Sequence, residues 1–147
     1  MKRALLIFLL CIAASPAAAQ WRAGTSVDRM TDKTTHHAFL ASLEDSAVSL
    51  AVSCELGSSV NYAILGLRLA PKQDGTARIR FDQKESRAVR ALGSREAITL
   101  RAVTLREIEA SKRLLVRIVG YAGAEDYTFL LDGALTALAD IRKHCPS

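Results

Sequence analysis

Ala77-Arg78-Ile79-Arg80-Phe81-Asp82 is the stretch of sequence that decides the fold class. Apolar side chains at 77, 79 and 81 alternate with charged side chains at 78, 80 and 82, which is the period of a half-buried strand. In an extended chain this period turns Ile79 and Phe81 toward a core and both arginines toward solvent. The stretch therefore predicts a sheet with one packed face and one solvated face.

Further strand-like segments lie on both sides of this stretch. Ala38–Leu43 and Val48–Leu56 are separated by the polar Glu44-Asp45-Ser46 and predict a hairpin. Other segments with apolar or β-branched runs are 60–69, 86–91, 97–103, 114–119 and 127–131, with turns expected at 71–75 and 120–123 and one or two helical turns at 105–112. The fold class predicted is mainly β (α+β): an antiparallel β-sheet or sandwich.

The hydrophobic period changes near the C-terminus. Leu135, Leu138, Ile141 and Cys145 recur at helical spacing behind Asp132, a good N-cap residue. This pattern predicts a C-terminal helix of about three turns that closes the sheet.

The N-terminus carries an apparent export signal. A positively charged start and the apolar run Ala4–Ala14 precede the small-residue cleavage pattern Ala17-Ala18-Ala19. The apolar run is short for a membrane span. We therefore expect a signal peptide at 1–19 and a single exported β-rich domain at 20–147, periplasmic or secreted and without a membrane span; a retained membrane anchor is the alternative.

Two cysteines remain once the leader with Cys11 is removed. Cys54 and Cys145 lie 91 residues apart in a chain bound for an oxidising compartment, which favours a disulfide over free thiols. Neither cysteine has further ligands at the spacing of a metal site, so no metal or other cofactor is expected.

The charge of the chain is moderate after export. The formal net charge is +5, and loss of Lys2 and Arg3 lowers it to +3. Because this excess is small and few aromatic residues accompany it, a nucleic-acid binder is not indicated.

Basic residues concentrate in the middle of the chain, where 72–117 holds 12 basic and 6 acidic residues. Arg78 and Arg80 share a strand face, and the residues that could extend it into a basic surface are Arg87, Arg90, Arg95, Arg101 and Arg117. The guanidinium group binds carboxylates and phosphates through paired hydrogen bonds. Arg78, Arg80, Arg101 and Arg117 are therefore candidates for binding an anionic partner, either an envelope protein or an envelope polymer; the alternative is a solvated face that keeps the protein soluble.

Other residues with reactive side chains have simpler explanations. His36 and His37 point to opposite faces of an extended segment, so they predict a solvated loop or strand edge and not a metal site. Glu44-Asp45 and Glu125-Asp126 fall in predicted turns. The sequence lacks a Gly-x-Ser-x-Gly elbow, a phosphate-binding loop and a His-Glu-x-x-His helix. A protein that is not an enzyme is expected, and a small hydrolase of envelope polymers is the alternative.

Several residues together form a recognisable pattern. They are Trp21, expected to anchor a first strand, the acidic Asp28–Asp32 segment, Cys54, Arg80-Phe81-Asp82, and Phe129–Ala134 followed by Cys145. The pattern resembles the VasI/TagO-type family of exported proteins associated with type VI secretion, with a second likeness to invasion-associated periplasmic proteins. The resemblance implies a noncatalytic periplasmic or secreted accessory domain of the bacterial cell envelope, with no catalytic residues to transfer.

Overall fold

A computed structural model describes residues 20–67, 74–93, 96–120 and 123–146. This part of the chain forms one antiparallel sheet with the strand order β1-β2-β3-β4-β7-β6-β5-β8-β9, which confirms the expected mainly β architecture. The strands are β1 (Arg22–Val27), β2 (Thr34–Ala41), β3 (Ser49–Glu55), β4 (Asn61–Leu65), β5 (Asp74–Phe81), β6 (Arg87–Gly93), β7 (Ala97–Leu100), β8 (Arg113–Gly120) and β9 (Gly123–Leu130). The leader predicted at 1–19 and most of the turn predicted at 71–75 lie outside the described residues.

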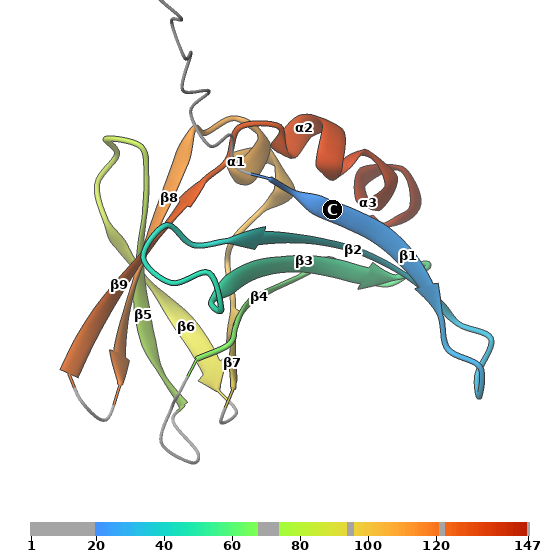
Figure 1. The fold of residues 1–147 in the computed structure, drawn as a ribbon, viewed down its shortest axis with the longest axis horizontal. Coiled ribbons are helices and arrows are strands. Elements are labelled where there is room, and N and C mark those ends of the chain that lie inside the picture. Colours follow the sequence, from blue (N-terminus) through green and yellow to red (C-terminus); the bar gives the residue numbers. More distant parts are fainter. Residues whose placement is uncertain (1–19, 68–73, 94–95, 121–122, 147) are drawn as a thin grey trace, which may run out of the picture.

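The sheet bends strongly between its two halves. In Figure 1, β2 and β3 run across the view, whereas β5, β6, β8 and β9 run steeply at one side. The β2–β3 turn reaches β9, where the Leu43 N–H donates to the Thr128 carbonyl at 2.9 Å and the Glu44 carboxylate accepts from the Thr128 N–H at 2.6 Å. These bonds use backbone groups on the outer edge of β9, which would otherwise be open to strand pairing.

The core lies on one face of the bent sheet, called the inner face here. Its largest fully buried side chains include Leu40, Leu50, Ile64, Ile79, Leu114 and Phe129. On β5 the alternation read from the sequence is present, because Ile79 and Phe81 are buried while Arg78 and Arg80 are exposed.

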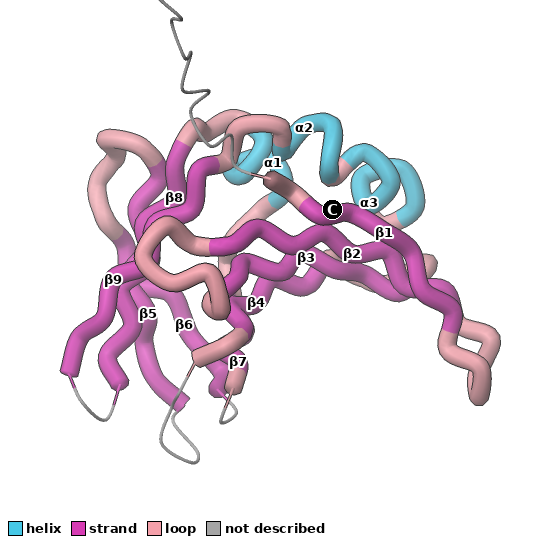
Figure 2. The backbone as a smooth tube through the Cα atoms, in the orientation of Figure 1, coloured by secondary structure: helices cyan, strands magenta, loops and turns pink. Residues whose placement is uncertain are grey.

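Three short helices pack against part of this core and lie along the top of the view in Figure 2. They are α1 (Leu105–Glu109), α2 (Ala134–Ala137) and α3 (Ala139–His144). α1 begins with a capping box, in which the Thr104 hydroxyl accepts from the Glu107 N–H and the Glu107 carboxylate accepts from the Thr104 N–H. α2 contacts both other helices, and α3 contacts β2.

The C-terminal helix differs from the prediction in two ways. The chain breaks at Leu138 into α2 and α3, and the residue before α2 is Gly133 in a left-handed conformation, so Asp132 does not cap the helix. Leu135 is 59% exposed, whereas Leu138 and Ile141 are buried. Because the chain does not continue as one helix through Leu138 and Leu135 is exposed, the continuous apolar stripe expected from the sequence does not form.

Glycine ends β4 earlier than the sequence suggested. The strand stops at Leu65 because Gly66 has a φ of +81°, and a Cβ at this position would lie 2.0 Å from the backbone oxygen of Ala47. Gly57 has a similar φ of +79°, but an added Cβ there would meet nothing within 4 Å. Gly66 is thus required by close packing as well as by backbone conformation.

Candidate anion-binding site

Three arginines meet on the outer face of β5 and β8. In the antiparallel register, Arg78 lies directly opposite Arg117, and Arg80 lies opposite Leu115. All three arginines are exposed, since they alternate with core positions on both strands. The pairing of β5 with β8 therefore gathers three of the four arginines singled out from the sequence.

These side chains surround a small surface pocket. Its volume is about 140 Å³, and its lining residues are Arg78, Ile79, Arg80, Ser86, Leu115 and Arg117. Sites that enclose a whole small-molecule ligand usually measure roughly 300–1,000 Å³. The pocket suits one acidic group, such as a carboxylate or phosphate, whose parent molecule stays outside.

The three guanidinium groups differ in how they are engaged. Arg117 donates from Nε and Nη2 to the two carboxylate oxygens of Asp126, both at 2.6 Å. Arg78 donates from Nη2 to the Ser86 hydroxyl at 3.0 Å. Arg80 makes no side-chain hydrogen bond or ion pair with any residue in the part of the chain that the structure describes. None of the described residues therefore competes with a ligand for the donors of Arg80.

The Arg117–Asp126 pair is electrically neutral. The hydrogen bond from Arg117 lowers the pKa of Asp126, although burial opposes this shift, and the same bond raises the pKa of Arg117. Arg78 and Arg80 form no ion pair within the described ranges, and they give the pocket two further positive charges. Like charges at neighbouring positions of a sheet repel one another, and a bound anion would relieve that repulsion.

The other candidate arginines do not line the pocket, although Arg90 lies opposite Thr76 and is exposed on the same face as Arg78. Arg101 follows β7, two strands from β5, and does not line the pocket. Arg87 lies opposite the core residue Ile79 in the register and forms an ion pair with Glu107 at 2.7 Å. The expectation that Arg87 extends the basic surface is therefore wrong, because a residue opposite Ile79 lies on the inner face of the sheet and not on the face that carries Arg78 and Arg80. Arg95 lies outside the described residues.

Sequence reasoning missed the acidic partner of Arg117. Glu125-Asp126 was expected in a turn, but β9 begins at Gly123 and carries both residues. Asp126 lies opposite Arg117 across β8 and β9. The usable signal was the alternation of the polar Asp126 and Thr128 with the aromatic Tyr127 and Phe129, which extends the strand toward its start.

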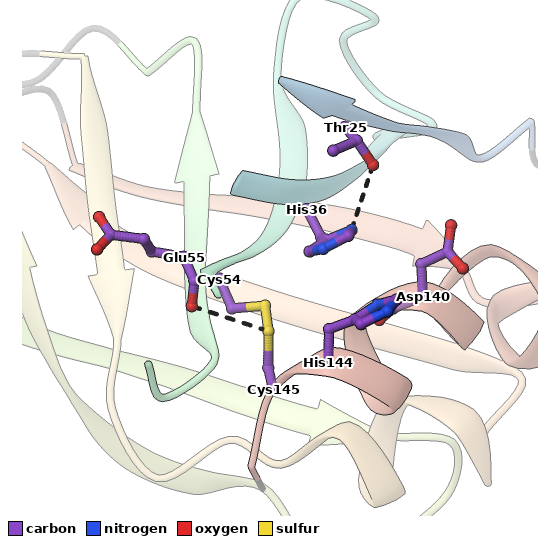
Figure 3. Close-up of a disulfide and its surroundings, with 7 residues drawn as sticks. All are labelled: Thr25, His36, Cys54, Glu55, Asp140, His144 and Cys145. Carbon is purple, nitrogen blue, oxygen red and sulfur yellow. Dashed lines mark hydrogen bonds between the residues drawn. A yellow bond between two sulfur atoms is a disulfide. The ribbon is translucent and has the colours of Figure 1, made fainter. Parts of the chain in front are cut away.

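A disulfide ties the C-terminal helix to the sheet (Figure 3). Cys54 near the end of β3 is bonded to Cys145 directly after α3, with their Cα atoms 6.4 Å apart. Both residues are buried. The predicted pairing is therefore present in the structure.

A pair of stacked histidines adjoins this disulfide. His36 lies opposite Cys54 in the β2–β3 register and stacks on His144, with ring centroids 4.6 Å apart and planes within 6° of parallel (Figure 3). His36 is 8% exposed, so the expectation of a solvated position is wrong for this residue. Lone pairs of parallel, stacked rings lie in separate planes and cannot converge on one ion. The described residues contain no group of three or more potential metal ligands.

The same cluster does not form a catalytic triad. The Thr25 hydroxyl lies 3.2 Å from Nδ1 of His36, which places a hydroxyl beside a base. However, Asp140 offers only its backbone carbonyl, and it accepts from Nδ1 of His144 at 2.9 Å. No described carboxylate orients His36, as the third member of a catalytic triad would. The cluster instead packs α3 against β2.

Comparison of the chain with known proteins found no similar protein. No protein-family model matches the chain, and no curated protein or solved structure matches it. Within the described residues, no helix is long and apolar enough to cross a membrane.

Proposed function

We propose that the protein is a noncatalytic accessory or binding module of the bacterial cell envelope, periplasmic or secreted, which captures an acidic group of a larger envelope partner. The observation that carries this proposal is the pocket on β5 and β8, where Arg80 has no partner among the described residues and lies beside Arg78 and Arg117. The export signal read from the sequence supports the compartment. The resemblance to type VI secretion accessory proteins is compatible with this role.

The chemistry favours capture of an anion over its conversion. Guanidinium groups bind carboxylates and phosphates strongly but do not transfer protons near neutral pH. Leu115 supplies the apolar part of the pocket wall, and Ser86 supplies a hydroxyl. These groups can hold and orient an acidic group on the outer face of the sheet. An acidic envelope polymer such as peptidoglycan is the partner that this proposal favours.

Cosedimentation with purified peptidoglycan tests the proposal. The variant Arg78→Gln/Arg80→Gln should bind roughly tenfold more weakly at low salt and lose most of the salt dependence, because charge-assisted bonds are removed. The matched control Arg29→Gln/Lys143→Gln removes the same charge from exposed positions outside the pocket. Asp126→Asn should strengthen binding, since it releases Arg117 from its carboxylate partner.

Two results would contradict the proposal. Equal binding by the pocket variant and the control would show that the arginines form only a solvated face. Release of soluble fragments that stops after one serine or acidic substitution would favour the hydrolase. If the protein binds anionic vesicles but not peptidoglycan, the arginine pocket recognises a lipid head group instead of a polymer.

A further inference from the structure

A second and larger pocket lies away from the arginine pocket. Its volume is about 540 Å³, and it is bordered by the start of β4, the segment leading into α1, α1 itself and the end of α3. This volume falls within the range of roughly 300–1,000 Å³ that is typical of sites for small molecules. None of its lining residues belongs to the arginine pocket on β5 and β8.

The floor of this pocket is apolar. Tyr62, Val103 and Leu105 line it and are buried, while Val60 is half-buried and Pro146 is exposed at the rim. Side chains of this kind gain free energy when a ligand removes their remaining apolar surface from water. The floor therefore favours a ligand with an apolar body.

Tyr62 also contributes a hydroxyl group to the lining of this pocket. Burial raises the pKa of Tyr62 to about 12, and a backbone hydrogen bond from Leu105 partly offsets the shift. The hydroxyl of Tyr62 therefore stays protonated at neutral pH and can donate a hydrogen bond to an acceptor on a ligand.

The rim of the pocket is positively charged. Glu109 and Arg142 both line it and form an ion pair at 2.5 Å, so their charges cancel. Arg106 also lines the rim, is exposed, and has no ion-pair partner within the described ranges. The remaining charge of +1 complements one carboxylate and disfavours a cation.

The disulfide fixes one side of the pocket. Pro146 follows Cys145, which is bonded to Cys54 on β3, and Arg142 belongs to the same short helix. The C-terminal part of the rim is thus covalently attached to the sheet. A site whose walls are held in place loses less conformational entropy when it binds a ligand.

We infer that this pocket binds a single-chain amphiphilic carboxylate, with its apolar tail on Tyr62, Val103 and Leu105 and its carboxylate at Arg106. The inference stands independently of the proposed function, because it uses a different site. A fatty acid is the simplest molecule of this class, and a labelled fatty acid is therefore used as the probe.

Fluorescence titration with dansyl-labelled undecanoic acid, below its micelle concentration, tests this site on the purified protein. We expect saturable binding of one probe per chain. Val60→Trp should weaken binding at least about tenfold by filling the pocket, whereas Val27→Trp adds the same ring at an exposed position on β1 and should not. Arg78→Gln/Arg80→Gln should bind the probe like the wild type, which separates this site from the proposed function.

Competition with lauric acid and with its methyl ester tests the role of charge. Arg106→Gln should lower the affinity for lauric acid by roughly fivefold to tenfold, since one charge-assisted hydrogen bond is lost, and should leave the affinity for the ester unchanged. Arg29→Gln, which removes an exposed charge outside the pocket, should change neither ligand. The inference is overturned if Val60→Trp binds like Val27→Trp, or if the ester competes as well as the acid with the wild-type protein.

Discussion

Removal of the Cys54–Cys145 bond should lower the free energy of unfolding substantially. The two residues are 91 positions apart in sequence. In the chain-entropy model, closing a loop of this size lowers the conformational entropy of the unfolded chain and so stabilises the folded protein by about 4–5 kcal/mol. This is an upper value, because residual structure in the unfolded chain reduces the effect. For a domain of this size such a loss corresponds to a fall in Tm of roughly 15 °C.

This effect can be measured on two forms of the protein by thermal and urea unfolding, with circular dichroism as the readout. The double variant Cys54→Ala/Cys145→Ala removes the bond and two buried sulfur atoms. The reduced wild type keeps every side chain and serves as the matched control for lost packing. Both should stay folded, because Leu138, Ile141 and the His36–His144 stack still hold the helix against the sheet.

The size of the difference decides whether the reasoning holds. If the oxidised and reduced wild-type proteins differ by less than about 1 kcal/mol, the unfolded chain is not restricted as the entropic model requires. A large loss in the double variant alone would assign the effect to the packing of the sulfur atoms.

Three further changes test local features of the fold. Gly66→Ala should destabilise by more than about 3 kcal/mol, because a backbone clash adds to the strain of a positive φ, whereas Gly57→Ala should cost about 1–2 kcal/mol; equal losses in urea unfolding would refute the clash. Thr104→Ala should cost about 1 kcal/mol through loss of the capping box, measured in the same assay, and an unchanged midpoint would refute it. Burial raises the pKa of Glu44, but hydrogen bonds from Thr128 outweigh it and the net pKa is lowered, so its stabilising effect is present above the unfolded pKa and is lost as pH falls through the lower folded value. The Tm of Glu44→Gln should therefore lie below that of the wild type at pH 7 and converge with it in acid; a constant gap down to low pH would contradict this.

Local patterns in the sequence determined the parts of this fold that depend on near neighbours. The alternation from Ala77 to Phe81 predicted the packed and solvated faces of β5, and the two apolar runs around Glu44-Asp45-Ser46 predicted the β2–β3 hairpin. The apparent export signal and the two cysteines outside it predicted the pairing of Cys54 with Cys145. These predictions succeeded because side-chain period, turn composition and cysteine count are properties of the chain itself.

Tertiary structure decided which of these segments meet. Arg78 faces Arg117 only because β5 pairs with β8, although more than thirty residues separate them in sequence. The contact of Glu44 with β9 and the stacking of His36 on His144 likewise join distant segments. Strand order and register are chosen by the combined hydrogen bonding and core packing of the whole sheet, and no short stretch of sequence contains that information. The sequence by itself therefore named the arginines and the cysteines, whereas the fold determined which arginines share a pocket and where a second pocket forms beside the C-terminal helix.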